Sequence, residues 1–332
     1  MGQLTMKLLS KRKSYFLFAI LATAFFYSKD GDITTSVYAT GAAFALPLAL
    51  AAMVGIMCER TGIVNIGIEG TLLLSSFVAF YVAIAAKSIL VGFVAAMATG
   101  VAMSLLLALM SVTWKMDQII AGTILNILAT GLTSFFYIQG NMLPSMFKQK
   151  PIPGLSNLPF FGDVLFKHGL LMYLGFVVII TLYYGLFHTP WGLRTRSVGE
   201  HPSSADTAGV SVSRMRYVNV AVAGAIGGLC GSYLVLELVG SWNRGFTAGK
   251  GFTALALMIF GRWNPMGALA AAMFFGLAQA GANQLMINGT VNIPPQFVGI
   301  LPYVMTIIVL AISAGKVRPP AAEGQPYEKG QS

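Results

Sequence analysis

The chain has 332 residues, of which 56% are apolar and only 10% are Asp, Glu, Lys or Arg. A soluble globular domain carries about a quarter of charged residues to keep its surface hydrated, so this composition argues against a water-soluble enzyme. The formal charge of +10 at pH 7 would fit a nucleic-acid-binding protein, but the basic residues lie between apolar segments. That placement is typical of a membrane protein, whose basic loops set its orientation.

The apolar segments predict an all-α, polytopic membrane fold. A helix needs roughly 20 apolar residues to cross a bilayer, and about ten segments approach that length, the first and the eighth being short. We expect a cytoplasmic segment over 1–13, a transmembrane domain over 14–315 and a cytoplasmic tail over 316–332. The predicted spans are 14–28, 37–57, 63–86, 88–113, 118–138, 169–187, 217–239, 251–261, 266–286 and 296–314.

The basic residues predict how the chain is oriented. With the amino terminus in the cytoplasm, fourteen of the 21 Lys and Arg residues fall inside and seven outside, as cytoplasmic loops prefer. Both termini and loop 188–216 are then cytoplasmic, and loop 139–168 is external. The basic cluster at 11–13 and the apolar run after it also resemble a cleavable signal peptide, which would leave nine spans. The run continues past the cleavage site, which favours a retained first span.

Two halves of the chain have similar span patterns. The four spans within 37–138 begin outside and the four within 217–314 begin inside, which predicts an inverted repeat of four plus four helices. The second span of each half is irregular: glycines surround Glu69 in one, and the other is short and follows the glycine-rich stretch 245–251. Matching broken segments point to a transport pathway. Alternatively, the glycines serve close helix packing.

Polar residues within the spans are candidates for a translocation path, because such residues usually face a cavity or a partner. Glu69 either lies on the path or caps the helix that runs on from Gly70. The amides either bind a neutral polar solute or hold helices together. Two other acids have structural interpretations, Glu59 in an ion pair with Arg60 and Glu237 at a solvated helix end. The path candidates are Asn65, Gly67, Glu69, Asn126, Gln279 and Asn283.

The sequence contains no motif for catalysis or for a cofactor. Its three histidines form no HExxH pattern, and its two cysteines are far apart with no CxxC. The string Gly249-Lys250-Gly251 does not complete a Walker A loop, which requires GxxxxGK followed by Ser or Thr. We therefore predict no metal, no cofactor and no enzymatic activity, so that any ATP hydrolysis takes place on a partner chain.

Loop 188–216 is the most distinctive polar segment. Pro202 at a first helical position, small residues after it and Gly209 as a terminator predict a two-turn helix outside the membrane. A short exposed helix between two spans, preceded by Arg194 and Arg196, is suited to docking into another protein. On composition alone, an ordinary basic inner loop is favoured over a docking element.

Several ordered motifs, taken together, resemble one protein family. They occupy 59–70, 117–126, 189–200 and 259–268, and the likeness extends from about residue 40 to 314. The family comprises the permease subunits of ABC importers for simple sugars and nucleosides, related to the ribose and branched-chain amino acid permeases. The string Asn-Ile-Gly-x-Glu-Gly at 65–70 is most similar to the nucleoside-type branch.

The resemblance implies a type II-like importer permease in the bacterial plasma (inner) membrane that moves nucleosides or a related sugar-like solute. It implies a second permease chain, a separate ABC ATPase and a solute-binding lipoprotein or periplasmic protein. The alternative is a stand-alone secondary transporter of a small polar solute. Family members more often have Asn at the position of His201. The residues assigned to the ATPase-coupling loop are Arg194, Arg196, Glu200, His201, Pro202, Ala205 and Gly209.

Overall fold

The computed structural model describes residues 23–287, 300, 304 and 318–329, which are predominantly helical. Predicted spans 14–28 and 296–314 lie mostly outside these residues. Two π-helical segments, η1 (Leu109–Thr113) and η2 (Leu234–Val239), continue α4 and α10. The α-helices are α2 (Gly31–Glu59), α3 (Ile68–Ala85), α4 (Ile89–Ala108), α5 (Gln118–Phe135), α6 (Phe161–Leu165), α7 (Leu170–His188), α8 (Pro190–Glu200), α9 (Pro202–Thr207), α10 (Val212–Tyr233), α11 (Lys250–Phe260) and α12 (Pro265–Ile287).

The predicted polytopic helical fold is confirmed. Among the described residues, seven helices are long and apolar enough to cross a membrane, and they match predicted spans two to seven and nine. The helix α2 begins six residues before the predicted 37, because Asp30 caps it by accepting a hydrogen bond from the N–H of Ile33 at 2.9 Å. The helix α11 has only 11 residues, which confirms the short eighth span.

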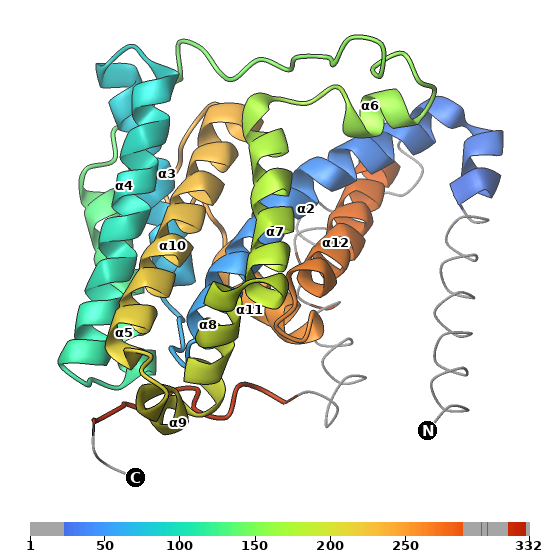
Figure 1. Ribbon diagram of the computed structural model, residues 1–332. Helices are drawn as coiled ribbons and strands as arrows, with labels where there is room; N and C mark the ends of the chain where they lie inside the picture. The colour runs from blue at the N-terminus through green and yellow to red at the C-terminus, as the bar shows by residue number, and fades with distance from the viewer. Residues whose placement is uncertain (1–22, 288–299, 301–303, 305–317, 330–332) are drawn as a thin grey trace, which may run out of the picture.

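The chain places different loops at the two ends of the helix bundle. The short helices α8 and α9 and residues 318–329 lie at one end, and α6 with the long 139–168 segment lies at the other (Figure 1). Loops 188–216 and 139–168 are thus on opposite ends, as the basic-residue pattern predicts for the two sides of a membrane.

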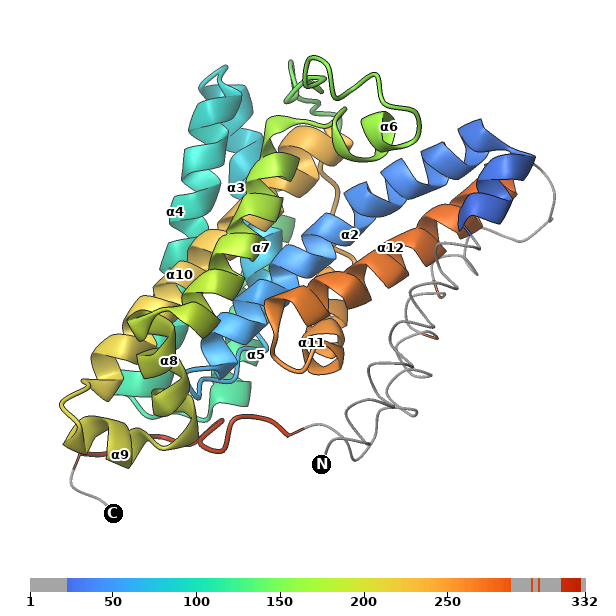
Figure 2. The ribbon, with the colours of Figure 1, turned by 45° about the vertical axis from the view of Figure 1, so that its right-hand side comes forward.

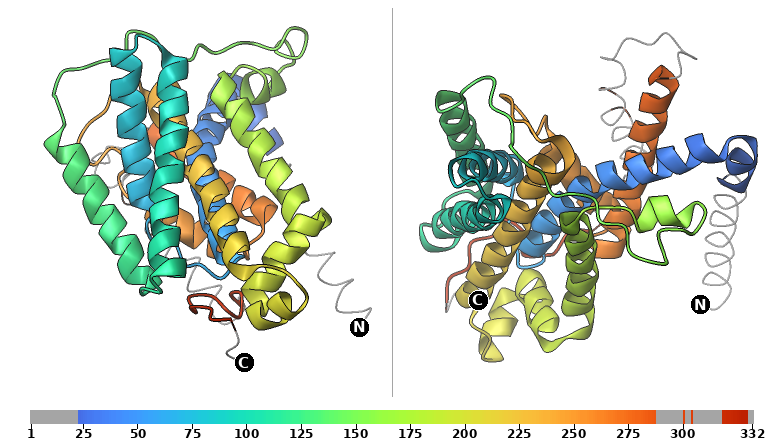
Figure 3. Two further views of the ribbon diagram at one scale, coloured as in Figure 1. Left: turned by 60° about the vertical axis from the view of Figure 1, so that its left-hand side comes forward. Right: turned by 90° about the horizontal axis from the view of Figure 1, so that it is seen from above.

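The helix α2 is the centre of the bundle. It is apolar all round, which is typical of a helix buried on every side, and every residue from Ala49 to Glu59 is buried. It crosses the molecule obliquely with α12 beside it (Figure 2). The helices α3, α4 and α5 group on the far side of α10 (Figure 3).

The helix contacts follow the predicted inverted repeat for the first three helices of each half. The fourth predicted span of the second half lies mostly outside the described residues. If α2, α3 and α4 correspond to α10, α11 and α12, each major contact has a counterpart. The helix α2 packs on α12 as α10 packs on α4, and α3 packs on α10 as α11 packs on α2. The end of α2 and the start of α10 both lie at the α8–α9 end, so the two helices run in opposite directions (Figure 1).

Matching glycine contacts support the same correspondence. A Cβ on Gly100 of α4 would lie 2.2 Å from the carbonyl oxygen of Gly224 on α10. A Cβ on Gly276 of α12 would lie 2.3 Å from the carbonyl oxygen of Gly41 on α2. Small residues allow helix backbones to approach this closely in membranes. Tight glycine packing therefore occurs at repeat-related positions, outside the two broken segments at 62–70 and 245–251.

We predict that Gly100→Ala destabilises the protein, because the added methyl group would collide with backbone atoms of α10. Overpacking of this kind costs about 1–3 kcal/mol. The matched control is Gly281→Ala on α12, where no described residue lies within 4 Å of the added Cβ. Thermal unfolding in detergent measures the difference. Equal melting temperatures for the two variants would contradict the close α4–α10 contact.

Candidate functional site

The first feature of the site is the break between α2 and α3. Backbone without helical structure is tolerated at membrane depth only where protein or water satisfies its polar groups, and α5 supplies the partners here. Gln118 Oε1 accepts a hydrogen bond from the N–H of Val64 at 2.6 Å. Asn126 accepts from the N–H of Gly70 at 2.7 Å and donates to the carbonyl of Ile66 at 3.0 Å.

Glycines allow α5 to approach this break. A Cβ on Gly122 would lie 2.8 Å from the backbone nitrogen of Gly67. Asn65 is buried beside them and donates to Cys58 Sγ at 3.4 Å, while its Oδ1 has no hydrogen-bond partner among the residues that the structure describes. The structure therefore brings Asn65, Gly67 and Asn126 together, and their visible contacts hold a broken span.

The Glu69 carboxylate connects this break to the second broken span. It accepts hydrogen bonds from Thr247 Oγ1 at 2.6 Å, from the N–H of Gly249 at 2.8 Å and from the N–H of Gly251 at 2.6 Å. These N–H groups lie at the start of α11, where a negative charge is favoured by the helix dipole. Glu69 therefore caps α11, and the prediction that it caps its own helix is wrong.

The predicted Glu59–Arg60 ion pair is also wrong, because both side chains turn to Trp263 instead. Glu59 accepts from the indole Nε1 of Trp263, and Arg60 donates from Nε to its carbonyl at 3.0 Å. Trp263 follows α11 and is only 5% exposed. The end of α2 is thus fastened to the α11–α12 turn.

Glu237 is not the solvated end that the sequence predicted. It accepts hydrogen bonds from the N–H groups of Leu171 at 2.7 Å and Met172 at 3.2 Å, in the first turn of α7. The first N–H groups of a helix have no partner within the helix, so a carboxylate from a neighbouring helix satisfies them here. Glu69 and Glu237 therefore both cap a helix to which they do not belong.

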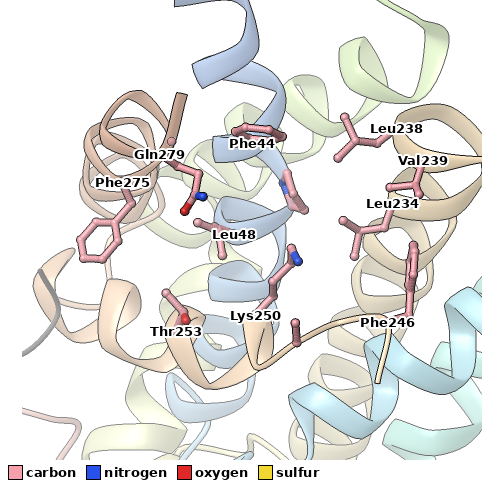
Figure 4. A pocket seen from close by; sticks show the side chains of 13 residues that line it. Phe44, Leu48, Leu234, Leu238, Val239, Phe246, Lys250, Thr253, Phe275 and Gln279 are labelled. Atoms are coloured by element: carbon pink, nitrogen blue, oxygen red, sulfur yellow. The ribbon is translucent and has the colours of Figure 1, made fainter. Parts of the chain in front are cut away.

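A cavity of about 440 Å³ lies between α2, η2, the 240–249 segment, α11 and α12. Its walls are mostly apolar, and Lys250 and Gln279 add polar groups that point into it (Figure 4). Pockets for small molecules have this character and span about 300–1,000 Å³. The lining residues are Phe44, Pro47, Leu48, Leu234, Leu238, Val239, Phe246, Ala248, Lys250, Thr253, Phe275, Gly276 and Gln279.

The predicted path residues divide between the cavity and the breaks. Gln279 lines the cavity, whereas Asn283, one turn further along α12, is not among the lining residues. Glu69 supports the wall of the cavity, since its carboxylate accepts hydrogen bonds from the N–H groups of Gly249 and Gly251, on either side of Lys250. Lys250 is a site residue that the sequence did not predict, because there it stands in a string that does not complete a nucleotide-binding motif.

Loop 188–216 folds into two short helices rather than one. The predicted helix at Pro202 is α9, which ends before Gly209, whose φ of +85° favours glycine. The unpredicted α8 is capped by Thr189, whose hydroxyl accepts from the N–H of Gly192 at 3.2 Å. Glu200, His201 and Gly209 are exposed in this chain, whereas Ala205 is buried.

The end of α8 contacts the break between α2 and α3 directly. A Cβ on Gly199 would lie 2.3 Å from the carbonyl oxygen of Arg60. Beside it, Arg216 of α10 donates from Nε to the carbonyl of Thr61 at 3.1 Å. The helix pair and the first broken span therefore form one continuous packed unit.

A multispan helical bundle with two broken spans around a cavity, and with a helix pair at one end, defines a membrane transport protein. Within residues 23–287, 300, 304 and 318–329, no group of three or more His, Cys, Asp or Glu side chains could hold a metal ion. The chain belongs to the family described as branched-chain amino acid transport system / permease component, whose model matches residues 37–310. It is therefore a membrane permease subunit of an ABC importer.

Named relatives agree with this assignment. The chain is 37% identical over 310 residues to the guanosine ABC transporter permease protein NupQ of Bacillus subtilis, covering 87% of this chain and 95% of that protein. It is 38% identical to the nucleoside ABC transporter permease protein NupC of Lactococcus lactis, covering 86% and 94%. A third relative, the guanosine ABC transporter permease protein NupP of B. subtilis, is 25% identical and covers 81% and 78%.

We predict that Glu69→Ala destabilises the protein, because it leaves the N–H groups of Gly249 and Gly251 and the hydroxyl of Thr247 without their acceptor. Loss of a partner to a buried donor costs about 1–3 kcal/mol. The control is Asp163→Ala, which removes an exposed carboxylate paired with Lys167. Thermal unfolding in detergent compares them. A Glu69→Ala protein as stable as the control would show that α11 needs no cap.

Proposed function

We propose that the chain is the permease subunit of an importer for nucleosides. Support comes from the two relatives with 37% and 38% identity, one named for guanosine and one for nucleosides, which match nearly their whole length. The cavity in the bundle is of a size and character suited to a small organic molecule. A simple sugar-like solute is the nearest alternative within the same class.

The proposed path runs beside the two broken spans, α3 and α11, and is completed by a second permease chain. Large apolar side chains on α5 are exposed in the single chain, among them Ile127 at 68% and Phe135 at 81%. Such a face is covered either by lipid or by another subunit. NupP and NupQ are both named as guanosine permease proteins of one organism, and both resemble this chain. That pairing supports a heterodimer.

The α8–α9 pair is the proposed docking element for the ABC ATPase. It lies at the end of the bundle opposite the 139–168 segment (Figure 1), and its Gly199 packs on the broken span at Arg60. We place this end and both termini in the cytoplasm, as the basic residues predict. The opposite end, with α6, would receive solute from a solute-binding lipoprotein or periplasmic protein.

Reconstitution tests this function. The chain is purified in mild detergent with the chains that accompany it, and uptake of radiolabelled guanosine is measured in proteoliposomes. We expect uptake that requires ATP and a co-purifying ATPase, and that persists when a protonophore is added. Uptake by this chain alone, driven by an ion gradient, would instead support the stand-alone transporter.

A charge reversal tests the coupling role of α8. In Glu200→Lys, the carboxylate that accepts a hydrogen bond from the N–H of Ala321 at 3.2 Å is replaced by a cation. We expect normal membrane insertion and ATP hydrolysis but at least tenfold less uptake per ATP hydrolysed. The matched control is Asp163→Lys at the opposite end of the bundle. Unchanged uptake per ATP in Glu200→Lys would show that this region only holds the ATPase and does not transmit its motion.

A replacement of Gly209 gives a second test of the same unit. At φ +85° a side chain strains the backbone whatever the space around it, so Gly209→Val should distort the turn between α9 and α10. We expect the same loss of uptake per ATP as for Glu200→Lys. Normal coupling in Gly209→Val would show that this turn does not transmit motion.

A further inference from the structure

The cavity between α2, α11 and α12 has a composition that selects its ligand. Its polar side chains are Lys250, Thr253 and Gln279, and the aromatic side chains of Phe44 and Phe246 contribute to its walls (Figure 4). Aromatic walls accept the face of a planar ring, and an amide can bond to both donors and acceptors at a ring's edge. An ammonium group donates only, so it requires an acceptor on the ligand.

The charges around the cavity favour an uncharged ligand over an anionic one. The Lys250 ammonium is the only cationic group among the lining residues. Glu69 accepts hydrogen bonds from the N–H groups of Gly249 and Gly251, the two neighbours of Lys250 in the chain. The Lys250 ammonium donates to the carbonyl of Thr247 at 3.3 Å, and the negative charge of Glu69 acts on it electrostatically and partly offsets its charge. An uncharged solute rich in hydrogen-bond acceptors fits such a site better than a phosphate ester does.

We propose that this cavity is a solute subsite within a single permease chain, that it holds the ring of an uncharged purine nucleoside between its apolar walls, and that Gln279, Thr253 and Lys250 bind the polar edge of that solute. This inference rests on the proposed function. It assigns solute contact to α2, α11 and α12 of one chain, in addition to any contact at the interface with a second permease chain.

Cysteine protection tests the subsite in the complete transporter. The two native cysteines, Cys58 and Cys230, are buried and fully shielded, which keeps background labelling low. Gln279→Cys and Thr253→Cys place a thiol at the cavity, and Phe274→Cys places one on α12 outside it, at a position 54% exposed. Each is treated with a small alkylating reagent with and without guanosine, and with guanosine monophosphate as the anionic probe.

We expect guanosine to slow labelling of Gln279→Cys and Thr253→Cys at least fivefold, to leave Phe274→Cys unchanged, and to protect better than guanosine monophosphate does. Two cavity variants guard against the failure of either one to fold. Unprotected thiols in a transporter that imports guanosine would overturn the subsite and leave the proposed function standing. Failure of the unmodified transporter to import guanosine would instead overturn the proposed function.

A separate observation concerns residues 318–329, which we call the strap. The strap lies across the α8–α9 end of the bundle (Figure 1). The N–H of Ala322 donates to the carbonyl of Gly199 at 2.9 Å, and the N–H of Gly324 donates to the carbonyl of Gly62 at 3.1 Å. Ala322 is only 3% exposed. Two residues of the strap therefore bond to α8 and to the α2–α3 break respectively.

Further side-chain contacts hold the strap against the bundle. Tyr327 packs on the apolar cluster that joins α8, α9 and α10, and Glu328 forms an ion pair with Lys115 before α5. Glu323 lies at the end of α2, where burial raises the pKa of its carboxyl above the ordinary value. It lies beside the carboxyl of Glu59.

We infer that the strap is a mechanical link that makes the α8–α9 pair and the α2–α3 break move as one body when the ATPase acts. The α8–α9 pair packs on the break at Gly199, and the strap adds hydrogen bonds to Gly199, Glu200 and Gly62. Glu69 then carries the movement from α3 to α11 and the cavity.

Removal of the strap tests the link in the complete transporter. We expect deletion of 318–332 to leave ATPase activity within twofold of normal while guanosine uptake per ATP falls at least fivefold. Ala322→Trp, which cannot fit a buried site, should have the same effect in a full-length chain. The control is Gln325→Ala, at an exposed position of the strap. Normal uptake per ATP in both disruptive variants would overturn the link, as would equal losses of ATPase activity and uptake.

Discussion

The structure depends on one constraint, that unpaired backbone groups at membrane depth must find partners within the protein. Two spans are interrupted, and each interruption exposes N–H groups that a continuous helix would have satisfied. Side chains from other helices supply the acceptors, with Gln118 and Asn126 at the first break and Glu69 at the second. The placement of these partners determines which helices are joined to the two breaks.

The partners also determine what can move together. Asn126 ties α5 to the first break and Glu69 ties α3 to the start of α11, so a shift of one broken span alone would break these hydrogen bonds. The same first break touches α8 through Gly199 and α10 through Arg216. A chain of direct contacts therefore runs from the α8–α9 end to the cavity, and it consists of bonds to backbone atoms, which change length less readily than contacts between flexible side chains.

Much of this architecture could be predicted from the sequence, because apolar length and glycine position are local signals. The order of the apolar spans, the short α11 and the α9 helix begun by Pro202 and ended before Gly209 are examples. The partners of the acids could not be predicted in this way. Glu69 and Glu237 each cap a helix far away in the sequence, and only the packing of α3 on α11, or of η2 near α7, brings acceptor and donor together. The role of residues 318–329 was missed for the same reason.

The two halves of the inverted repeat solve the same problem with different chemistry, and the difference has a consequence for the cavity. The first break is satisfied by neutral amides, which add no net charge, whereas the second is satisfied by a carboxylate beside an ammonium. The Lys250 ammonium donates to the carbonyl of Thr247 at 3.3 Å, and the Glu69 carboxylate attracts it electrostatically. The half of the repeat that carries the acid is therefore also the half that presents a charged hydrogen-bond donor to the cavity.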